Sequence, residues 1–207
     1  MFLDEFIGKQ LGHPSGMMSG LVAVFMNRNT AYMNKMTVQL LGINQTDRAL
    51  DIGFGGGVGI LEMTKLAQDG LVAGIDISDA MLKRGRKKFS KLISQGKVEL
   101  SEGSASQIPY KDGFFDKVSA VNSIYFWPDP IAGLKEVHRV LKNGGVFILG
   151  VFPKEWLEKL PFARHGFAIY SDGQLQDFLN GAGFTNIRIE HRKHKPVSAT
   201  FVIGSKA

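Results

Sequence analysis

The chain has 207 residues, of which 44% are hydrophobic and 21% are charged. This length suits one domain with a single core, and the composition excludes disordered, collagen-like and coiled-coil proteins. The absence of cysteine excludes disulfides, thiolate metal sites and a cysteine nucleophile. The net charge of +6 permits an anionic partner without specifying one. The 25 glycines are well above the usual ~7%, which predicts tight turns or a close approach of the backbone to a ligand.

The N-terminus lacks the features of a secretory signal. The apolar residues Phe2 and Leu3 are followed at once by Asp4 and Glu5, with no basic segment before an apolar one. The longest apolar run, at 146–152, is far below the ~20 residues that cross a bilayer. We therefore expect a cytoplasmic protein with no membrane span.

The first 40 residues differ from the rest of the chain. They contain six of the eight methionines, and five of these lie in segments of helical character: Met17, Met18, Met26, Met33 and Met36. Met-rich helices are adaptable packing surfaces. We expect a helical extension at 1–40 and a main domain at 41–207. The extension is interpreted either as an extra layer covering the sheet or as a mobile lid over a ligand.

From residue 48 onward, short apolar runs alternate with segments of helical period. This alternation predicts an α/β protein with a doubly wound, mostly parallel sheet of seven strands. Strands are expected at 48–53, 71–76, 97–101, 115–122, 146–152, 186–191 and 197–203, and helices at 58–66, 79–93, 131–141 and 173–179. Ser78 or Asp79 can cap the second of these helices. The directions of the last two strands cannot be read from the pattern.

A glycine-rich loop joins the first strand to the first helix. It has the form D-x-G-x-G-x-G from Asp51 to Gly57, at the place where a doubly wound sheet binds its ligand. The dinucleotide fingerprint is incomplete because Val58 stands at its third glycine, and the lysine of a phosphate-binding loop is missing. Asp51 would repel a pyrophosphate and attract an ammonium group. A tight turn without a ligand is the alternative.

A second carboxylate, Asp76, ends the next strand 21 residues after Gly55 (76 − 55). This fold places an acid there on ribose hydroxyls. The two carboxylates together indicate a ligand that carries a ribose and a cation.

Several spaced motifs in the expected order now give a resemblance. Residues 51–59, 74–82, 102–110 with 115–116, and 139–145 are similar to the glycine-rich loop, the ribose-binding segment, and the third-, fourth- and fifth-strand motifs of class I S-adenosylmethionine-dependent methyltransferases of the small-molecule type. The resemblance covers about residues 48–150. It implies a Rossmann-like fold and S-adenosylmethionine as cofactor.

The resemblance also implies the cofactor site. The loop from Gly53 to Gly57 would hold the methionine part, Asp76 the ribose, and the later residues the adenine or its surroundings. The expected cofactor-binding residues are Asp51, Gly53, Phe54, Gly55, Gly57, Asp76, Ile77, Met81, Ser104, Ala105 and Asn122. The chain departs from the family at Ser104, where many members have an acid or amide, and at Asn143, where a proline is common.

On the acceptor side, Tyr125 or Trp127 is expected to face the substrate, and ordinary loop packing of the two aromatics is the alternative. The segment Asn122-Ser123-Ile124-Tyr125 lacks the two prolines of enzymes that methylate amino groups of nucleic acids. The five histidines have no metal-binding spacing, so no metal is expected. No catalytic residue is assigned.

The sequence thus predicts an enzyme that transfers the methyl group to a small or lipid-like acceptor by in-line displacement. The alternatives are a nucleoside-binding module without catalysis and an RNA-modifying methyltransferase that uses the basic segments 83–91 and 191–195. Nucleic acid is disfavoured as a partner, because neither basic segment is interleaved with aromatic residues. The acceptor and the oligomeric state are not predicted.

Overall fold

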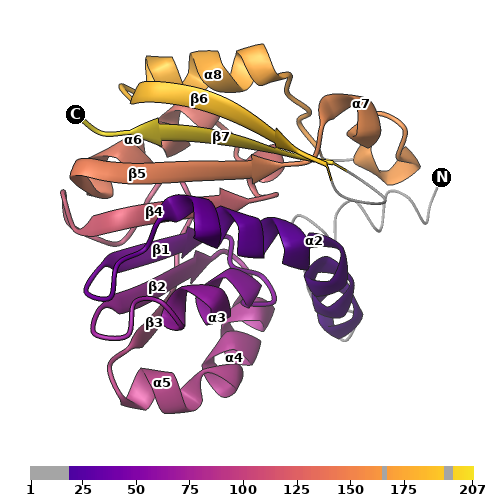
Figure 1. The fold of residues 1–207 in the computed structure, drawn as a ribbon. Coiled ribbons are helices and arrows are strands. Elements are labelled where there is room, and N and C mark those ends of the chain that lie inside the picture. The colour runs from indigo at the N-terminus through magenta and orange to yellow at the C-terminus, as the bar shows by residue number, and fades with distance from the viewer. Residues whose placement is uncertain (1–18, 165–166, 194–197) are drawn as a thin grey trace.

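A seven-stranded sheet forms the centre of the molecule (Figure 1). The computed structural model describes residues 19–164, 167–193 and 198–207. The strands are β1 (Arg48–Ile52), β2 (Leu71–Asp76), β3 (Val98–Glu102), β4 (Phe115–Val121), β5 (Leu141–Val151), β6 (Thr185–Arg192) and β7 (Ala199–Ser205). Their order across the sheet is β3-β2-β1-β4-β5-β7-β6, and β7 runs antiparallel to both of its neighbours. The predicted mostly parallel α/β sheet is confirmed, and the antiparallel strand is the last one.

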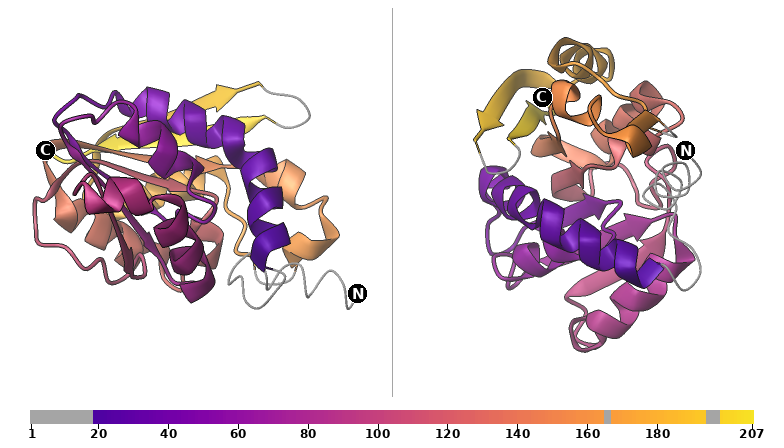
Figure 2. Two further views of the ribbon diagram at one scale, coloured as in Figure 1. Left: turned by 90° about the horizontal axis from the view of Figure 1, so that it is seen from below. Right: turned by 90° about the vertical axis from the view of Figure 1, so that its right-hand side faces the viewer.

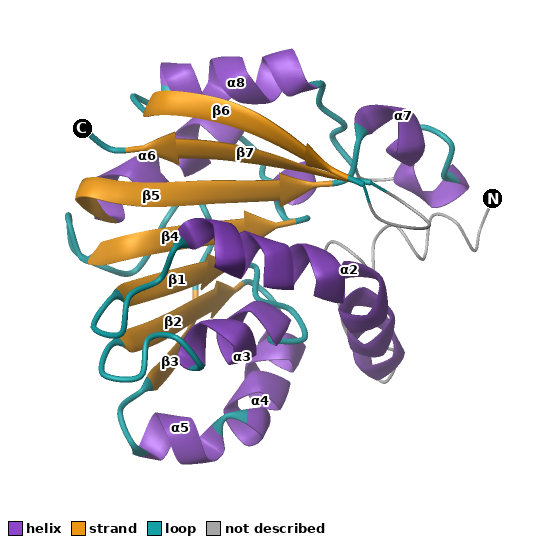
Figure 3. Cartoon of the chain, in the orientation of Figure 1, coloured by secondary structure: helices purple, strands orange, loops and turns teal. Residues whose placement is uncertain are grey.

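Helices cover both faces of this sheet (Figure 3). They are α2 (Ser19–Leu41), α3 (Val58–Thr64), α4 (Asp79–Lys88), α5 (Ser90–Ser94), α6 (Pro130–Val140), α7 (Lys154–Leu157) and α8 (Asp172–Gly181). Side chains of α2, α3 and α4 share one core cluster, and those of α6 and α8 share the other. Strands buried on both faces need apolar residues throughout, which explains the continuous burial of β1 after its first residue and of β7 up to its last.

Most element boundaries differ from the sequence prediction by one or two residues, and two larger differences have a visible cause. The helix expected at 79–93 is divided into α4 and α5 at Phe89, which leaves helical geometry and packs against the glycine loop at Gly57. Strand β5 begins at Leu141, because Phe115 pairs with Leu141 whereas Lys117 pairs with Val146. The Asn143-Gly144-Gly145 turn is therefore an irregularity within the strand, where a periodicity argument sees a stop.

The expected N-terminal helical extension contains α2. Its C-terminal half, where Met33, Thr37, Val38 and Leu41 are buried, packs on α3, β4 and β5. Figure 2 shows that α2 bends, so that this half lies along the sheet. This packing is compatible with a covering layer, and the choice between a layer and a lid for residues 1–40 stays a prediction. Residues 1–18 of this extension lie outside the described structure. None of the helices in the described ranges combines the length and the apolar character that crossing a membrane requires.

Candidate active site

A cavity of about 340 Å³ opens at the carboxyl ends of β1, β2 and β4. Among the residues predicted for the site, those that line it are Gly53, Gly55, Asp76, Ile77, Met81, Ser104, Ala105, Asn122 and Trp127. These residues come from four separate segments, 53–55, 76–81, 104–105 and 122–127, which the parallel strands bring to one edge of the sheet. Asp51, Phe54, Gly57 and Tyr125 are not among the lining residues.

The glycine loop needs its glycines for conformation and for space. Gly53, Gly55 and Gly57 have φ values of 69°, 48° and 70°, in the left-handed region that side chains disfavour. A Cβ on Gly53 would lie 2.9 Å from the Cβ of Ser123, and one on Gly57 would lie 2.7 Å from the Phe89 ring. The alternating pattern of the motif is therefore required by the backbone path.

Asp76 fixes this loop to the end of β2. One of its carboxylate oxygens accepts a hydrogen bond from the Gly55 N–H at 3.0 Å, and the other accepts one from the Ser78 N–H at 2.9 Å. Ser78 in turn caps α4, because its hydroxyl accepts from the Met81 N–H at 3.4 Å. The carboxylate is buried and faces the cavity with its position set by backbone donors.

Asp51 lies at the end of β1 but behind the cavity. Its Oδ1 accepts a hydrogen bond from the Ser119 hydroxyl at 2.9 Å, and its Oδ2 has no hydrogen-bond partner within the described residues. Burial raises the pKa of Asp51 to about 7; the Ser119 hydrogen bond opposes this shift and the nearby Asp76 adds to it. A Cβ at Gly59 would overlap Oδ2. Gly59 is thus the glycine that leaves room for this carboxyl, a role the sequence reasoning did not assign.

The other predicted residues outside the cavity support its walls. Phe54 is buried beneath Gly74 and Gly85, whose missing side chains make room for its ring. Tyr125 is buried directly behind Asn122, to which its hydroxyl donates a hydrogen bond at 3.2 Å. Burial raises the pKa of Tyr125, which keeps its hydroxyl protonated.

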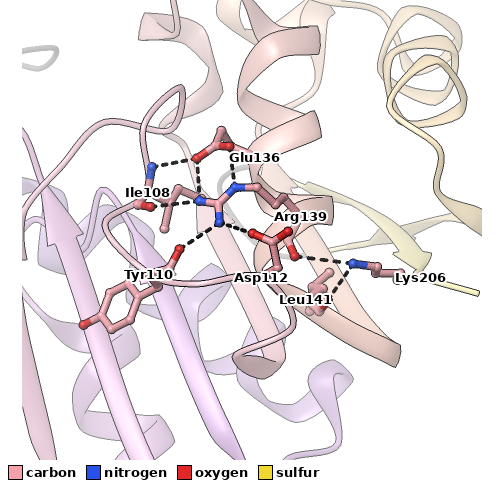
Figure 4. A network of polar contacts seen from close by, with 7 residues as sticks. All are labelled: Ile108, Tyr110, Asp112, Glu136, Arg139, Leu141 and Lys206. Carbon is pink, nitrogen blue, oxygen red and sulfur yellow. Dashed lines mark hydrogen bonds and ion pairs between the residues drawn. The ribbon is translucent and has the colours of Figure 1, made fainter.

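The loop after β3, which carries Ser104 and Ala105, is anchored from α6 by Arg139 (Figure 4). The guanidinium donates to Glu136 at 2.6 and 2.8 Å, to Asp112 at 2.7 Å, and to the carbonyl oxygens of Tyr110 at 2.8 Å and Ile108 at 3.1 Å. Glu136 also accepts from the Ile108 N–H at 3.1 Å, and its hydrogen bonds with Arg139 hold its pKa below the usual value. Sequence reasoning placed Arg139 in a motif but did not predict this network.

The end of the cavity near β4 is mostly apolar and aromatic. Phe126, Trp127 and Pro128 line it together with Asn122. Gly133 of α6 makes room for Trp127, because a Cβ there would lie 2.6 Å from the indole. Phe126 was missed by the sequence reasoning, since nothing in the pattern distinguishes it from the neighbouring loop aromatics. Within the described residues, no three His, Asp or Glu side chains gather as metal ligands.

Comparison with known proteins identifies the family. Residues 50–149 match the methyltransferase domain family. The uncharacterized methyltransferase YdaC of Bacillus subtilis is 32% identical over 180 residues, which are 87% of this chain and 93% of YdaC. The chain belongs to the class I S-adenosylmethionine-dependent methyltransferases. Membership in this family supports an enzyme over a binding module without catalysis.

Other methyltransferases extend the comparison. The chloroplastic 2-methyl-6-phytyl-1,4-hydroquinone methyltransferase 1 of rice is 30% identical over 170 residues. The match covers 77% of this chain and 50% of the rice protein. The demethylmenaquinone methyltransferase of Staphylococcus aureus is 28% identical over 75% of each chain. The structure of an S-adenosylmethionine-dependent methyltransferase from Aquifex aeolicus superposes with a TM-score of 0.71 at 20% identity, covering 87% of this chain and 93% of that one, which shows the shared fold.

Proposed function

We propose that this methyltransferase uses S-adenosylmethionine to methylate a small acceptor with an apolar body, of the quinol type. Two relatives, in rice and in S. aureus, are named as methyltransferases of a hydroquinone and of demethylmenaquinone. The aromatic and apolar end of the cavity is suited to such a ring. When bound, the cofactor supplies an activated methyl group on a sulfonium.

The position of Asp76 is the observation that carries the cofactor assignment. It faces the cavity from the end of β2, where this fold places an acid on ribose hydroxyls, and its own hydrogen bonds hold the glycine loop beside it. Ile77, which is 46% exposed, and the buried Met81 lie on the same side of the cavity as Asp76 and offer apolar contacts for the adenine ring. The residues present therefore fit a nucleoside with its ribose at Asp76 and its amino-acid part along Gly53 and Gly55.

The residues around Asn122 orient the acceptor in this proposal. An in-line displacement depends mainly on alignment of the acceptor with the methyl group. Phe126, Trp127 and Pro128 supply contacts for an apolar ring and exclude water from that end of the cavity. Tyr125 does not line the cavity and burial raises its pKa so that it stays protonated, and the proposal therefore does not use it as a general base for the acceptor.

An exposed basic face keeps RNA as a second candidate acceptor. Arg84, Arg86 and Lys87 of α4 and Lys91 of α5 are exposed on one side of the molecule. Binding through such a face would weaken steeply as salt is raised.

Calorimetric titration with S-adenosylhomocysteine tests the cofactor site. Asp76→Ala should weaken binding at least tenfold, because a hydrogen bond to a charged group is worth about 1.5–3 kcal/mol. Asp177→Ala, which removes an exposed carboxylate of α8, is the matched control and should bind as the parent does. Unchanged affinity in a folded Asp76→Ala protein would remove the basis of the assignment.

Transfer of a labelled methyl group tests the acceptor. The protein is incubated with methyl-labelled S-adenosylmethionine and, separately, a prenylated hydroquinone, the same ring without its tail, a small amine and a structured RNA. We expect label in the hydroquinones. Label in RNA, lost at high salt, would establish the second candidate, and label in the amine alone would refute the quinol class while leaving the cofactor site intact.

A further inference from the structure

Tyr125 has no direct role in the proposed methyl transfer, yet it contacts several segments around the cavity. Its side chain is buried, and its hydroxyl makes two hydrogen bonds. It accepts from the Phe152 N–H at 2.8 Å and donates to Oδ1 of Asn122 at 3.2 Å. Burial keeps the hydroxyl protonated, so its one hydrogen is available for Asn122.

Asn122 is held at both ends of its amide. Its Oδ1 takes the Tyr125 hydroxyl, and its Nδ2 lies 3.5 Å from Sδ of Met33 in α2. Its backbone is left-handed, with φ of 54°, and its own N–H donates to the Gly150 carbonyl at 2.8 Å. Asparagine adopts this conformation more readily than other residues that carry a side chain, so Asn122 suits the turn that follows β4. Asn122 lines the cavity, so the contacts that orient its amide also set what the cavity presents to a ligand.

Tyr125 also holds the segment that follows α7. Its carbonyl accepts from the Ala168 N–H at 3.0 Å, and its ring stacks on Phe167 with centroids 5.5 Å apart. Phe167 in turn meets the edge of Phe126, a cavity residue, at 4.7 Å. One residue therefore joins the ends of β4 and β5 with the segment 167–168, behind the wall of the cavity.

We propose that Tyr125 is a positioning residue for ligand binding, acting through Asn122. Its hydroxyl fixes the orientation of the Asn122 amide, and that amide contacts the cofactor. The proposal rests on the proposed function, because it takes the cavity to be the cofactor site. Without the hydroxyl, Oδ1 loses its donor and the amide can rotate about its side-chain bond, while the aromatic packing of residue 125 stays.

A double-mutant cycle tests the proposal through the affinity for S-adenosylhomocysteine. The chains compared are the parent, Tyr125→Phe, Asn122→Ala and the double variant. Tyr125→Phe should weaken binding three- to tenfold, Asn122→Ala at least as much, and the double variant no more than Asn122→Ala alone. Tyr170→Phe is the control, because it also removes a tyrosine hydroxyl from a ring that packs on a phenylalanine, here edge to face on Phe178, but this hydroxyl makes no hydrogen bond to any described residue. A merely structural role would lower the unfolding temperature without this dependence on Asn122.

Several outcomes would overturn the proposal. Multiplying effects of the two substitutions would show that Tyr125 acts independently of Asn122, and parent affinity in Tyr125→Phe would show that the hydroxyl positions nothing. If Asp76→Ala weakens binding but neither substitution does, this proposal fails and the proposed function stands. If Asp76→Ala has no effect either, both fail.

A second measurement serves if Tyr125→Phe does not fold. The side-chain amide resonances of Asn122 in the native protein can be assigned by their loss in Asn122→Ala. We expect them to exchange slowly with water and to shift when S-adenosylhomocysteine is added. Fast exchange, or no shift at saturating ligand, would overturn the proposal.

Discussion

The two ends of the cavity are built in different ways. At the carboxyl ends of β1 and β2, backbone conformation makes the site: Gly53 and Gly55 have positive φ, and Asp76 ties the loop down through backbone N–H groups. At the end of β4, side chains make it, with Asn122 held between Tyr125 and a methionine of α2. The end that the backbone forms, called here the backbone-built end, requires particular residues at fixed spacing in the sequence. The end that side chains form depends instead on which segments, distant in the sequence, come into contact in the fold.

The largest expected effect comes from breaking the backbone-built end. Gly55→Val should abolish measurable binding of S-adenosylhomocysteine, because valine at φ of 48° is strained and its side chain would enter the cavity. Calorimetry gives the affinity, and urea unfolding shows that the chain is folded.

Gly96→Val is the control that separates the effect of backbone strain from the loss of the binding site. Gly96 also has a positive φ, 68°, but nothing lies within 4 Å of its Cβ position and it is far along the chain from the loop. Both variants should lose about 1–3 kcal/mol of stability, while only Gly55→Val loses the ligand. Binding by a folded Gly55→Val protein at parent strength would mean that the loop is only a turn.

The next effect concerns Asp51, which lies behind the cavity on β1, the strand between β2 and β4. Its pKa is raised to about 7, so the folded chain holds a proton that the unfolded chain releases near pH 4. The free energy of unfolding should therefore decrease as pH rises from about 4 to about 7, by up to about 1.4 kcal/mol per pH unit from this group. Asp51→Asn should lack this contribution, and comparing the two chains by urea unfolding at pH 5, 6 and 7 cancels the other groups. Parallel pH profiles would show that Asp51 titrates normally.

The contrast between the two ends also explains how far the sequence could lead. The alternation of strands and helices, the glycine loop and Asp76 are local patterns with one physical cause each, and the fold and part of the cavity wall follow from them. The position of Phe126 and the place of Tyr125 behind Asn122 depend on segments far apart in the chain. Asp51 shows a further limit. Its spacing in the motif correctly predicts that it lies near the carboxyl end of β1, but not that its carboxyl turns toward Gly59 and away from the cavity.

Arg139 gives the third effect, because it joins the loop after β3 to α6. Arg139→Met should lower the free energy of unfolding by about 2 kcal/mol. It should also weaken the binding of S-adenosylhomocysteine several-fold, because the loop with Ser104 and Ala105 loses its anchor. Arg188→Met is the control: its ion pair with Glu190 is exposed and is worth less than about 1 kcal/mol. Equal losses in the two variants would mean that the partly buried hydrogen bonds of Arg139 to the carbonyl oxygens add nothing.

The smallest effect tests whether the glycine loop is also held from outside the cavity. The Lys88 ammonium of α4 donates to the carbonyl oxygens of Gly56 at 2.8 Å and Gly57 at 3.3 Å, and partial burial lowers its pKa. Lys88→Met keeps the aliphatic stem but removes these bonds, so the loop should move more and S-adenosylhomocysteine should bind about two- to threefold more weakly. Lys87→Met removes the same charge from an exposed neighbour, which separates loop support from overall electrostatic attraction. If both variants weaken binding equally, net charge is the cause; if only Lys88→Met does, the backbone-built end relies on a side chain after all.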